Sequence, residues 1–182
     1  MMNKAMWLTG LMIAVGVAII GCKGEQASNQ AAAVANSGAI LSAELSARVE
    51  RVLGDYEALR AVLAGDRLDE VAAIATRFET DGRAASVDAP VGVRAHLDAA
   101  VLAAGRLKGA GSADDQRRIF GDISRAVVSL LSEQSALAKG RYVFQCPMAQ
   151  GYQKWVQTTD GIENPYMGGR MLRCGSATEW GL

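Results

Sequence analysis

Beyond Cys22, the sulfur of this 182-residue chain is confined to its last quarter, and these sulfur atoms are the best candidates for chemistry. After Cys22, every Cys and Met lies between residues 146 and 174. Thiolates and thioethers together select soft ions such as Cu(I) over harder ones. The clustering therefore predicts a soft-metal site, with Cu(I) as the expected ion. The predicted ligands are Cys146, Met148, Met167, Met171 and Cys174.

The spacing of these donors suits a compact site. Cys146 and Met148 are two residues apart, so two soft donors can face one ion. Met171 and Cys174 are three residues apart, which places them on one side of a helical turn. Met167 precedes Met171 by four residues, and two glycines between them let the backbone bend.

Other metal ligands are scarce. His96 is the single histidine, and it would supply one nitrogen ligand if its helix faced the sulfur residues. Two thiolates without a second pair of Cys or His make an incomplete structural zinc set, so zinc is the weaker candidate.

The N-terminus resembles a bacterial lipoprotein signal peptide spanning residues 1–21. Lys4 precedes an uncharged apolar run from Leu8 to Ile20, which is short for a membrane span. The run ends in Gly21-Cys22, where a lipobox places its cleavage site. We expect lipidation of Cys22, anchoring to the membrane through the acyl chains, and a location outside the cytoplasm. An uncleaved N-terminal anchor helix is the alternative, and it gives the same location.

Residues 22–40 are small and polar, which predicts a flexible tether between the lipid anchor and the folded domain. The residue after Cys22 is Lys23, not the Asp that would suggest retention in the inner membrane. The periplasmic face of the outer membrane is therefore the expected address.

This location keeps a second interpretation of the cysteines open. Two Cys residues outside the cytoplasm, in a module with little core of its own, are usually joined. A Cys146–Cys174 disulfide would close a loop of about 29 residues and stabilise the fold by on the order of 3 kcal/mol. The methionines would then be packing residues in an envelope interaction domain. Redox exchange is a third interpretation, although it usually uses a closer Cys-x-x-Cys pair.

Charge and motifs narrow the class of function. The chain has 19 basic and 19 acidic side chains, and cleavage would remove only Lys4, leaving a slightly acidic mature protein. Nucleic-acid binding needs a basic surface, so no nucleic-acid partner is expected. A P-loop, a Rossmann fingerprint, a nucleophile elbow and the Glu-x-x-His pairs of di-iron bundles are all missing from the sequence. We therefore expect a binding protein and not an enzyme.

Residues 41–140 have the periodicity of amphipathic helices, with apolar side chains every three or four residues. The fold prediction is a mostly α protein with an antiparallel four-helix bundle. We expect Asp66 to cap the second helix and residues 82–88 to form a loop. The four expected segments run from Ser42 to Leu63, from Asp66 to Phe78, from Pro90 to Leu107 and from Ser112 or Asp114 to Leu137.

Residues 141–182 break this pattern with glycines, prolines and aromatic residues. Two short extended pieces, 142–144 and 155–157, predict a two-stranded ribbon within a small irregular module. Trp155 and Trp180 are the expected anchors that pack this module on the bundle.

The C-terminal motifs carry a family resemblance. They are Cys146-Pro147-Met148-Ala149, then Trp155, then Asn164-Pro165-Tyr166, then Met171-Leu172-x-Cys174-Gly175. This pattern resembles DUF3347, a bacterial periplasmic family catalogued as a domain of unknown function, and the likeness covers residues 41–178. Its members are small lipoproteins or domains fused to the periplasmic adaptor subunits of heavy-metal efflux pumps.

The resemblance implies metal handling, most often of copper, next to components of an efflux system. By match to the motif, it makes Cys146, Met148, Met171 and Cys174 the candidate ligands. Met167 stands where relatives carry other residues, so the resemblance gives it the least support.

Overall fold

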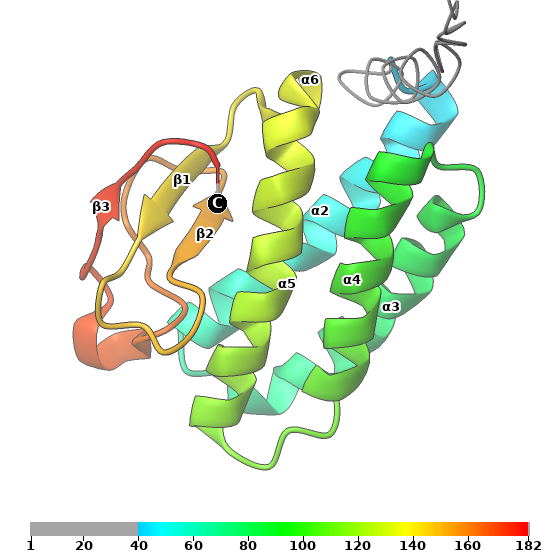
Figure 1. Cartoon of the computed structure of the whole chain (residues 1–182). Coiled ribbons are helices and arrows are strands. Elements are labelled where there is room, and N and C mark those ends of the chain that lie inside the picture. Colours follow the sequence, from blue (N-terminus) through cyan, green and yellow to red (C-terminus); the bar gives the residue numbers. More distant parts are fainter. Residues whose placement is uncertain (1–39, 182) are drawn as a thin grey trace, which may run out of the picture.

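The computed structural model describes residues 40–181, which fold into a mostly helical protein with a small three-stranded antiparallel sheet (Figure 1). The expected signal peptide, Cys22 and nearly all of the expected tether lie outside the described residues. None of the helices between residues 40 and 181 combines the length and the hydrophobicity that a membrane-spanning helix needs.

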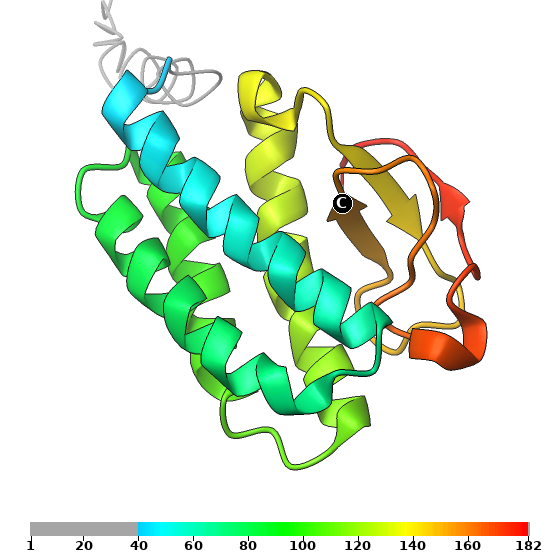
Figure 2. The ribbon, with the colours of Figure 1, turned by 180° about the vertical axis from the view of Figure 1, so that it is seen from behind.

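Four long helices make up most of the protein, and each packs against the next one along the chain. Consecutive long helices run in opposite directions (Figures 1 and 2). A short helix, α6, follows the last of them. The helices are α2 (Ala43–Ala64), α3 (Val71–Ser86), α4 (Val91–Leu107), α5 (Ala113–Glu133) and α6 (Ser135–Ala138).

Side-chain caps set where two of these helices begin. The Ser42 hydroxyl accepts the Leu45 N–H at 3.1 Å at the start of α2. The Ser112 hydroxyl accepts the Asp115 N–H at 3.1 Å at the start of α5. Each cap satisfies a backbone donor that the first helical turn leaves without a partner. The first start agrees with the predicted position, and the second is one of the two positions, Ser112 and Asp114, predicted from the sequence.

The second helix differs from its prediction at both ends. It starts at Val71, after the 3₁₀ turn η1 (Leu68–Glu70), and Asp66 does not cap it. The predicted loop at residues 82–88 was wrong, because α3 continues to Ser86. Gly82 lies inside the helix, where a Cβ would come within 2.4 Å of the Val101 side chain on α4. This glycine permits close packing of two helices and does not mark a turn.

The C-terminal module contains the sheet, whose strand order is β2-β1-β3. Antiparallel pairing places Phe144 of the central strand opposite Trp155 on one side and Ala177 on the other. The sequence predicted the two longer strands, and the third comes from the tail of the chain. The strands are β1 (Tyr142–Gln145), β2 (Lys154–Gln157) and β3 (Ser176–Ala177).

Strand β2 attaches the module to the helices, because it packs against α5 and α2 (Figure 2). The buried Tyr56 hydroxyl of α2 lies 2.5 Å from the Ser124 hydroxyl of α5 and accepts the Val156 N–H of β2 at 3.0 Å. Burial raises the pKa of Tyr56 well above its ordinary value, so the phenol stays neutral. Trp155 is fully buried and Trp180 is partly buried against the same core, which fits their expected anchoring role.

Loss of the Tyr56 hydroxyl should weaken this junction. Tyr56→Phe would leave the buried Val156 N–H and Ser124 hydroxyl without their partner, and we expect the free energy of unfolding to fall by about 2 kcal/mol. Urea unfolding followed by tryptophan fluorescence measures the change. Tyr142→Phe, which removes a hydroxyl from an exposed ring, is the matched control and should change the stability little. Equal stability of the two variants would contradict the role of the junction.

Candidate soft-metal site in the C-terminal module

The two cysteines meet at one end of the sheet. Cys146 directly follows β1, and Cys174 lies two residues before β3. Gln145 pairs with Ser176 in the antiparallel β1–β3 ladder, so the residues just beyond this pair face each other. The two Sγ atoms lie 3.7 Å apart and are not bonded to each other. The Cys146 side chain is fully buried and that of Cys174 is half-buried.

A tight turn holds the first cysteine. The Cys146 N–H donates to the Gln153 carbonyl at 3.0 Å, and the Ala149 N–H donates to the Cys146 carbonyl at 3.1 Å. The Gln153 side-chain amide donates to the Pro147 carbonyl at 3.0 Å. These bonds close the loop between β1 and β2 around the Cys-Pro-Met-Ala motif, with Met148 at its exposed tip.

Asn164 positions the second cysteine from inside the module. Its side-chain amide donates to the Cys174 carbonyl at 2.6 Å, and its side-chain oxygen accepts the N–H groups of Tyr166 at 2.8 Å and Met167 at 3.2 Å. Its backbone N–H donates to the Leu172 carbonyl at 2.8 Å. Asn164 is fully buried, so these bonds replace water for every polar atom of its side chain.

A close backbone approach follows the second cysteine. Gly175 has a φ of 139°, and a Cβ there would come within 2.8 Å of the Gln145 carbonyl oxygen and 2.9 Å of the Trp155 ring. Only glycine tolerates both the dihedral angle and the contact. The Cys-Gly pair of the motif can therefore pass directly beside the tryptophan.

Aromatic rings form the wall behind this approach. The Trp155 ring stacks on Phe144 with centroids 5.6 Å apart, and the Tyr166 ring meets it edge-on at 5.9 Å. The Trp155 indole N–H donates to the Gln157 side-chain oxygen at 2.9 Å, and the Tyr166 hydroxyl donates to the Lys154 carbonyl at 2.5 Å. The polar atoms of the Trp155 and Tyr166 side chains thus have hydrogen-bond partners, and the packed rings form a rigid support for the thiol pair.

The surroundings of Cys174 favour its neutral thiol over the thiolate. The hydrogen bond with Cys146 raises the pKa of the Cys174 thiol above its ordinary value, and burial raises it further. A metal ion needs the thiolate form, so binding an ion there would displace a proton.

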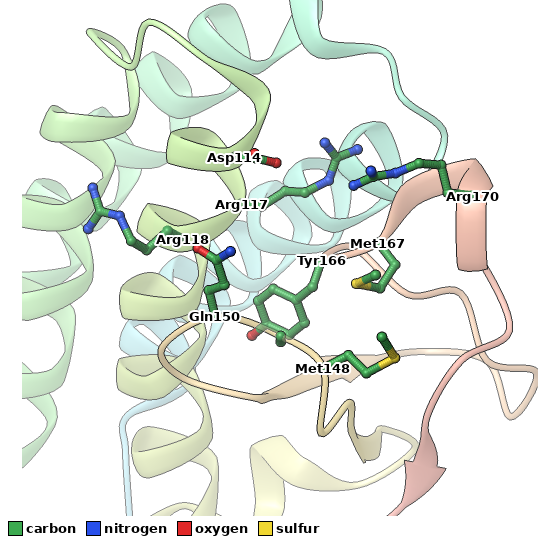
Figure 3. A pocket seen from close by; sticks show the side chains of 9 residues that line it. Asp114, Arg117, Arg118, Met148, Gln150, Tyr166, Met167 and Arg170 are labelled. Carbon is green, nitrogen blue, oxygen red and sulfur yellow. The ribbon is translucent and has the colours of Figure 1, made fainter.

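The methionines are placed differently from the thiols. Met148 is 58% exposed and Met171 is 38% exposed, whereas Met167 is partly buried against the core. The Met171 carbonyl accepts the Cys174 N–H at 2.9 Å, which ties these two residues together through the backbone. Within residues 40–181, neither thiol donates a hydrogen bond to a methionine sulfur. Met148 and Met167 line a pocket beside the module (Figure 3).

The structure does not bring His96 to the thiols. His96 lies on α4, and its Nε2 is 3.0 Å from a carboxylate oxygen of Glu133 on α5. Helix α4 packs against α3 and α5, with α5 between it and the sheet (Figure 1). Because α4 does not face the module, His96 is not placed to supply a nitrogen ligand. No group of three or more His, Cys, Asp or Glu side chains that could hold a metal ion is present in the described part of the chain.

Two charged contacts that the sequence did not predict fix the module on the helices. Asp66, which has a φ of 57°, pairs with Arg117 of α5 and accepts the Gly169 N–H at 2.8 Å. Arg60 of α2 donates to the Glu163 carbonyl at 3.0 Å and pairs with its carboxylate at 3.1 Å. The sequence offered one local sign of these contacts. Gly65-Asp66 stands at a helix end and is typical of a turn, although it does not reveal the partners of Asp66.

Comparisons with known proteins give no relative for this chain. No family model matches it, and no curated protein and no solved structure matches it either.

Asn164→Asp tests whether the buried amide positions Cys174. The change removes the donor to the Cys174 carbonyl and buries a carboxylate, so we expect the free energy of unfolding to fall by about 3 kcal/mol at pH 7. Cys174 should also react faster with a thiol reagent such as DTNB, because the segment that holds it opens more often.

Gln150→Glu is the matched control for this prediction, because it makes the same amide-to-acid change at an exposed position of the module. If Asn164→Asp and Gln150→Glu have the same urea midpoint and the same DTNB rate, Asn164 does not hold the second cysteine in place.

Proposed function

We propose that this protein is a periplasmic lipoprotein that binds soft metal ions, with Cu(I) preferred, through its paired cysteines. The observation that carries the proposal is the 3.7 Å separation of the Cys146 and Cys174 sulfurs. Two thiols 28 positions apart in sequence are held next to each other by a buried hydrogen-bond network. They meet where the aromatic motif residues provide a rigid support.

The sulfur separation favours a bent coordination geometry. An ion with metal–sulfur bonds of about 2.3 Å separates two sulfurs by about 3.8 Å at a tetrahedral angle, about 4.0 Å at a trigonal angle and about 4.6 Å in a linear arrangement. The observed distance is close to the first two values and far from the third. Such an ion needs at least one donor beyond the two thiolates.

The exposed methionines are the best candidates for that further donor. Met148 follows Cys146 by two residues, and the backbone of Met171 is bonded to that of Cys174. Their side chains are exposed and flexible, so they can turn toward an ion without disturbing the core. Met167 packs against the core and is a weaker candidate. A ligand set of two thiolates and a thioether is entirely soft, which favours Cu(I).

The position of the site supports handling of the ion as cargo and not catalysis. Cys174 is half-buried and the two methionines are exposed, so a bound ion would be within reach of another protein. Together with the expected lipid anchor at Cys22, this supports work in the envelope next to components of a metal efflux system. A nucleic-acid partner and enzymatic activity form no part of the proposal.

We assign the helical part to an antiparallel four-helix bundle that serves as the scaffold of this site. The consecutive packing of α2, α3, α4 and α5 supports the assignment. On this reading the C-terminal module is a sulfur-bearing addition attached to the bundle along α2 and α5.

A structural disulfide is the second candidate for the same cysteines. Cys146 is fully buried, and side-chain rotation would bring two sulfurs 3.7 Å apart within bonding distance in an oxidising compartment. The protein would then be an envelope interaction domain locked by the Cys146–Cys174 bond.

A Cu(I) titration of the full chain under reducing, anaerobic conditions, against a competing chelator, tests the metal proposal. Cys22→Ala is the background for all samples, so that only two thiols remain. We expect one Cu(I) per chain, and we expect the Met148→Leu, Met171→Leu double variant to bind at least ten-fold more weakly. Met167→Leu is the matched control and should bind with nearly unchanged affinity.

Two results would overturn the metal proposal. One is a lack of competition with the chelator, and the other is equal affinity in the double variant and the control. Thiol counting on the chain isolated from the periplasm then decides the alternative. Absence of free thiol would support the structural disulfide, and two free thiols per chain would contradict it.

A further inference from the structure

A pocket of about 230 Å³ lies between the first turns of α5 and the C-terminal module (Figure 3). Arginine side chains from two elements reach it, two from α5 and one from the 3₁₀ turn η2 (Gly168–Met171). The side chains that matter for its chemistry are Arg117, Arg118, Arg170, Met148, Met167 and Tyr166. One side of the pocket is therefore rich in hydrogen-bond donors, and another is an apolar wall of methionine and tyrosine side chains.

Arg117 has a hydrogen-bond donor that the protein does not use. The residue is only 7% exposed. One terminal nitrogen of its guanidinium pairs with Asp66 and also donates to the Leu63 carbonyl at 3.3 Å. Its Nε is buried and has no hydrogen-bond partner among the described residues. A buried donor without an acceptor is costly, so an acceptor that reached this nitrogen would stabilise the guanidinium.

The exposed side chain of Arg170 supplies a second set of donors. It makes no hydrogen bond and no ion pair with another side chain or with the backbone within residues 40–181. Figure 3 shows the Arg117 and Arg170 side chains converging from α5 and η2 on the same side of the pocket. Asp66 pairs with Arg117, so Arg170 leaves one positive charge in excess at this side of the pocket, and that charge would attract an oxyanion.

The acidic groups near the pocket leave these donors free. Asp66 binds the terminal nitrogen of Arg117, not its Nε. Arg118 pairs with the exposed Asp115 at 3.3 Å. Asp114 also lines the pocket, but it is exposed and lies at the α5 end, away from Arg170 (Figure 3).

We propose that this pocket binds a small oxyanion, a carboxylate or a phosphoryl group, between Arg117 and Arg170. The Arg117 Nε–H and the planar guanidinium fork of Arg170 would donate to the oxyanion oxygens. A short apolar part of the same ligand would lie against Met148, Met167 and the ring of Tyr166. The site is independent of the metal proposal, which rests on the thiols, although Met148 and the weaker candidate donor Met167 belong to both.

Titration of the full chain in non-ionic detergent, with inorganic phosphate in one arm and butyrate in the other, tests this site at constant ionic strength. The readout is the NMR signal of the Arg117 Nε–H group, which should shift on gaining an acceptor, together with the dissociation constant. We expect saturable binding of at least one probe and none of chloride. Tighter binding of phosphate would identify a phosphoryl ligand, and tighter binding of butyrate a carboxylate.

Matched variants locate the site. Arg170→Gln should weaken binding about ten-fold, because it removes a charged donor pair. Arg117→Lys keeps a charge beside Asp66 but lacks the Nε–H, and it should weaken binding to a similar extent. Arg51→Gln removes the same charge from an exposed position on α2 and should leave binding unchanged. Binding of neither probe, or an equal loss in Arg170→Gln and Arg51→Gln, would overturn the proposal.

Discussion

One buried amide, the side chain of Asn164, is the constraint on which the sulfur site depends. Its donor holds the Cys174 carbonyl, and its acceptor oxygen holds two successive backbone N–H groups. Its own backbone bonds to Leu172 and Gly168 close the same segment. Since this segment has little regular structure, the Asn164 bonds take the place of a helix or strand ladder. The 3.7 Å contact between the thiols is a consequence of this arrangement.

The module has this shape only because the helices support it. Its aromatic residues belong to one continuous hydrophobic core with α2 and α5. Tyr56 joins α2, α5 and β2 through a single hydroxyl group, and Asp66 connects the end of α2 to Arg117 and to Gly169. Removing either contact leaves buried polar groups without partners. The geometry of the thiols therefore depends on residues of α2 that lie far from them in the sequence.

Local signals predicted the parts of this structure that depend on neighbouring residues. Helix periodicity and the caps at Ser42 and Ser112 located the starts of two helices, and β-branched and aromatic residues located two strands. Gly82 misled the prediction, because its reason is contact with Val101 of another helix. The partners of Asn164 and Asp66 are set by tertiary folding, and the Asp66–Gly169 bond spans 103 positions. No local pattern encodes such pairs, so the grouping of sulfurs in sequence predicted the thiol pair but not the separate placement of the methionines and His96.

X-ray absorption spectroscopy at the copper edge, on the Cu(I)-loaded full chain with Cys22 replaced by Ala, shows whether the paired cysteines hold the ion. We expect three sulfur neighbours at about 2.3 Å, two from the cysteines and one from a methionine. We also expect loss of this shell in the Cys146→Ser, Cys174→Ser variant. A first shell of nitrogen or oxygen neighbours, or a sulfur shell that survives removal of both cysteines, would show that Cys146 and Cys174 do not bind Cu(I).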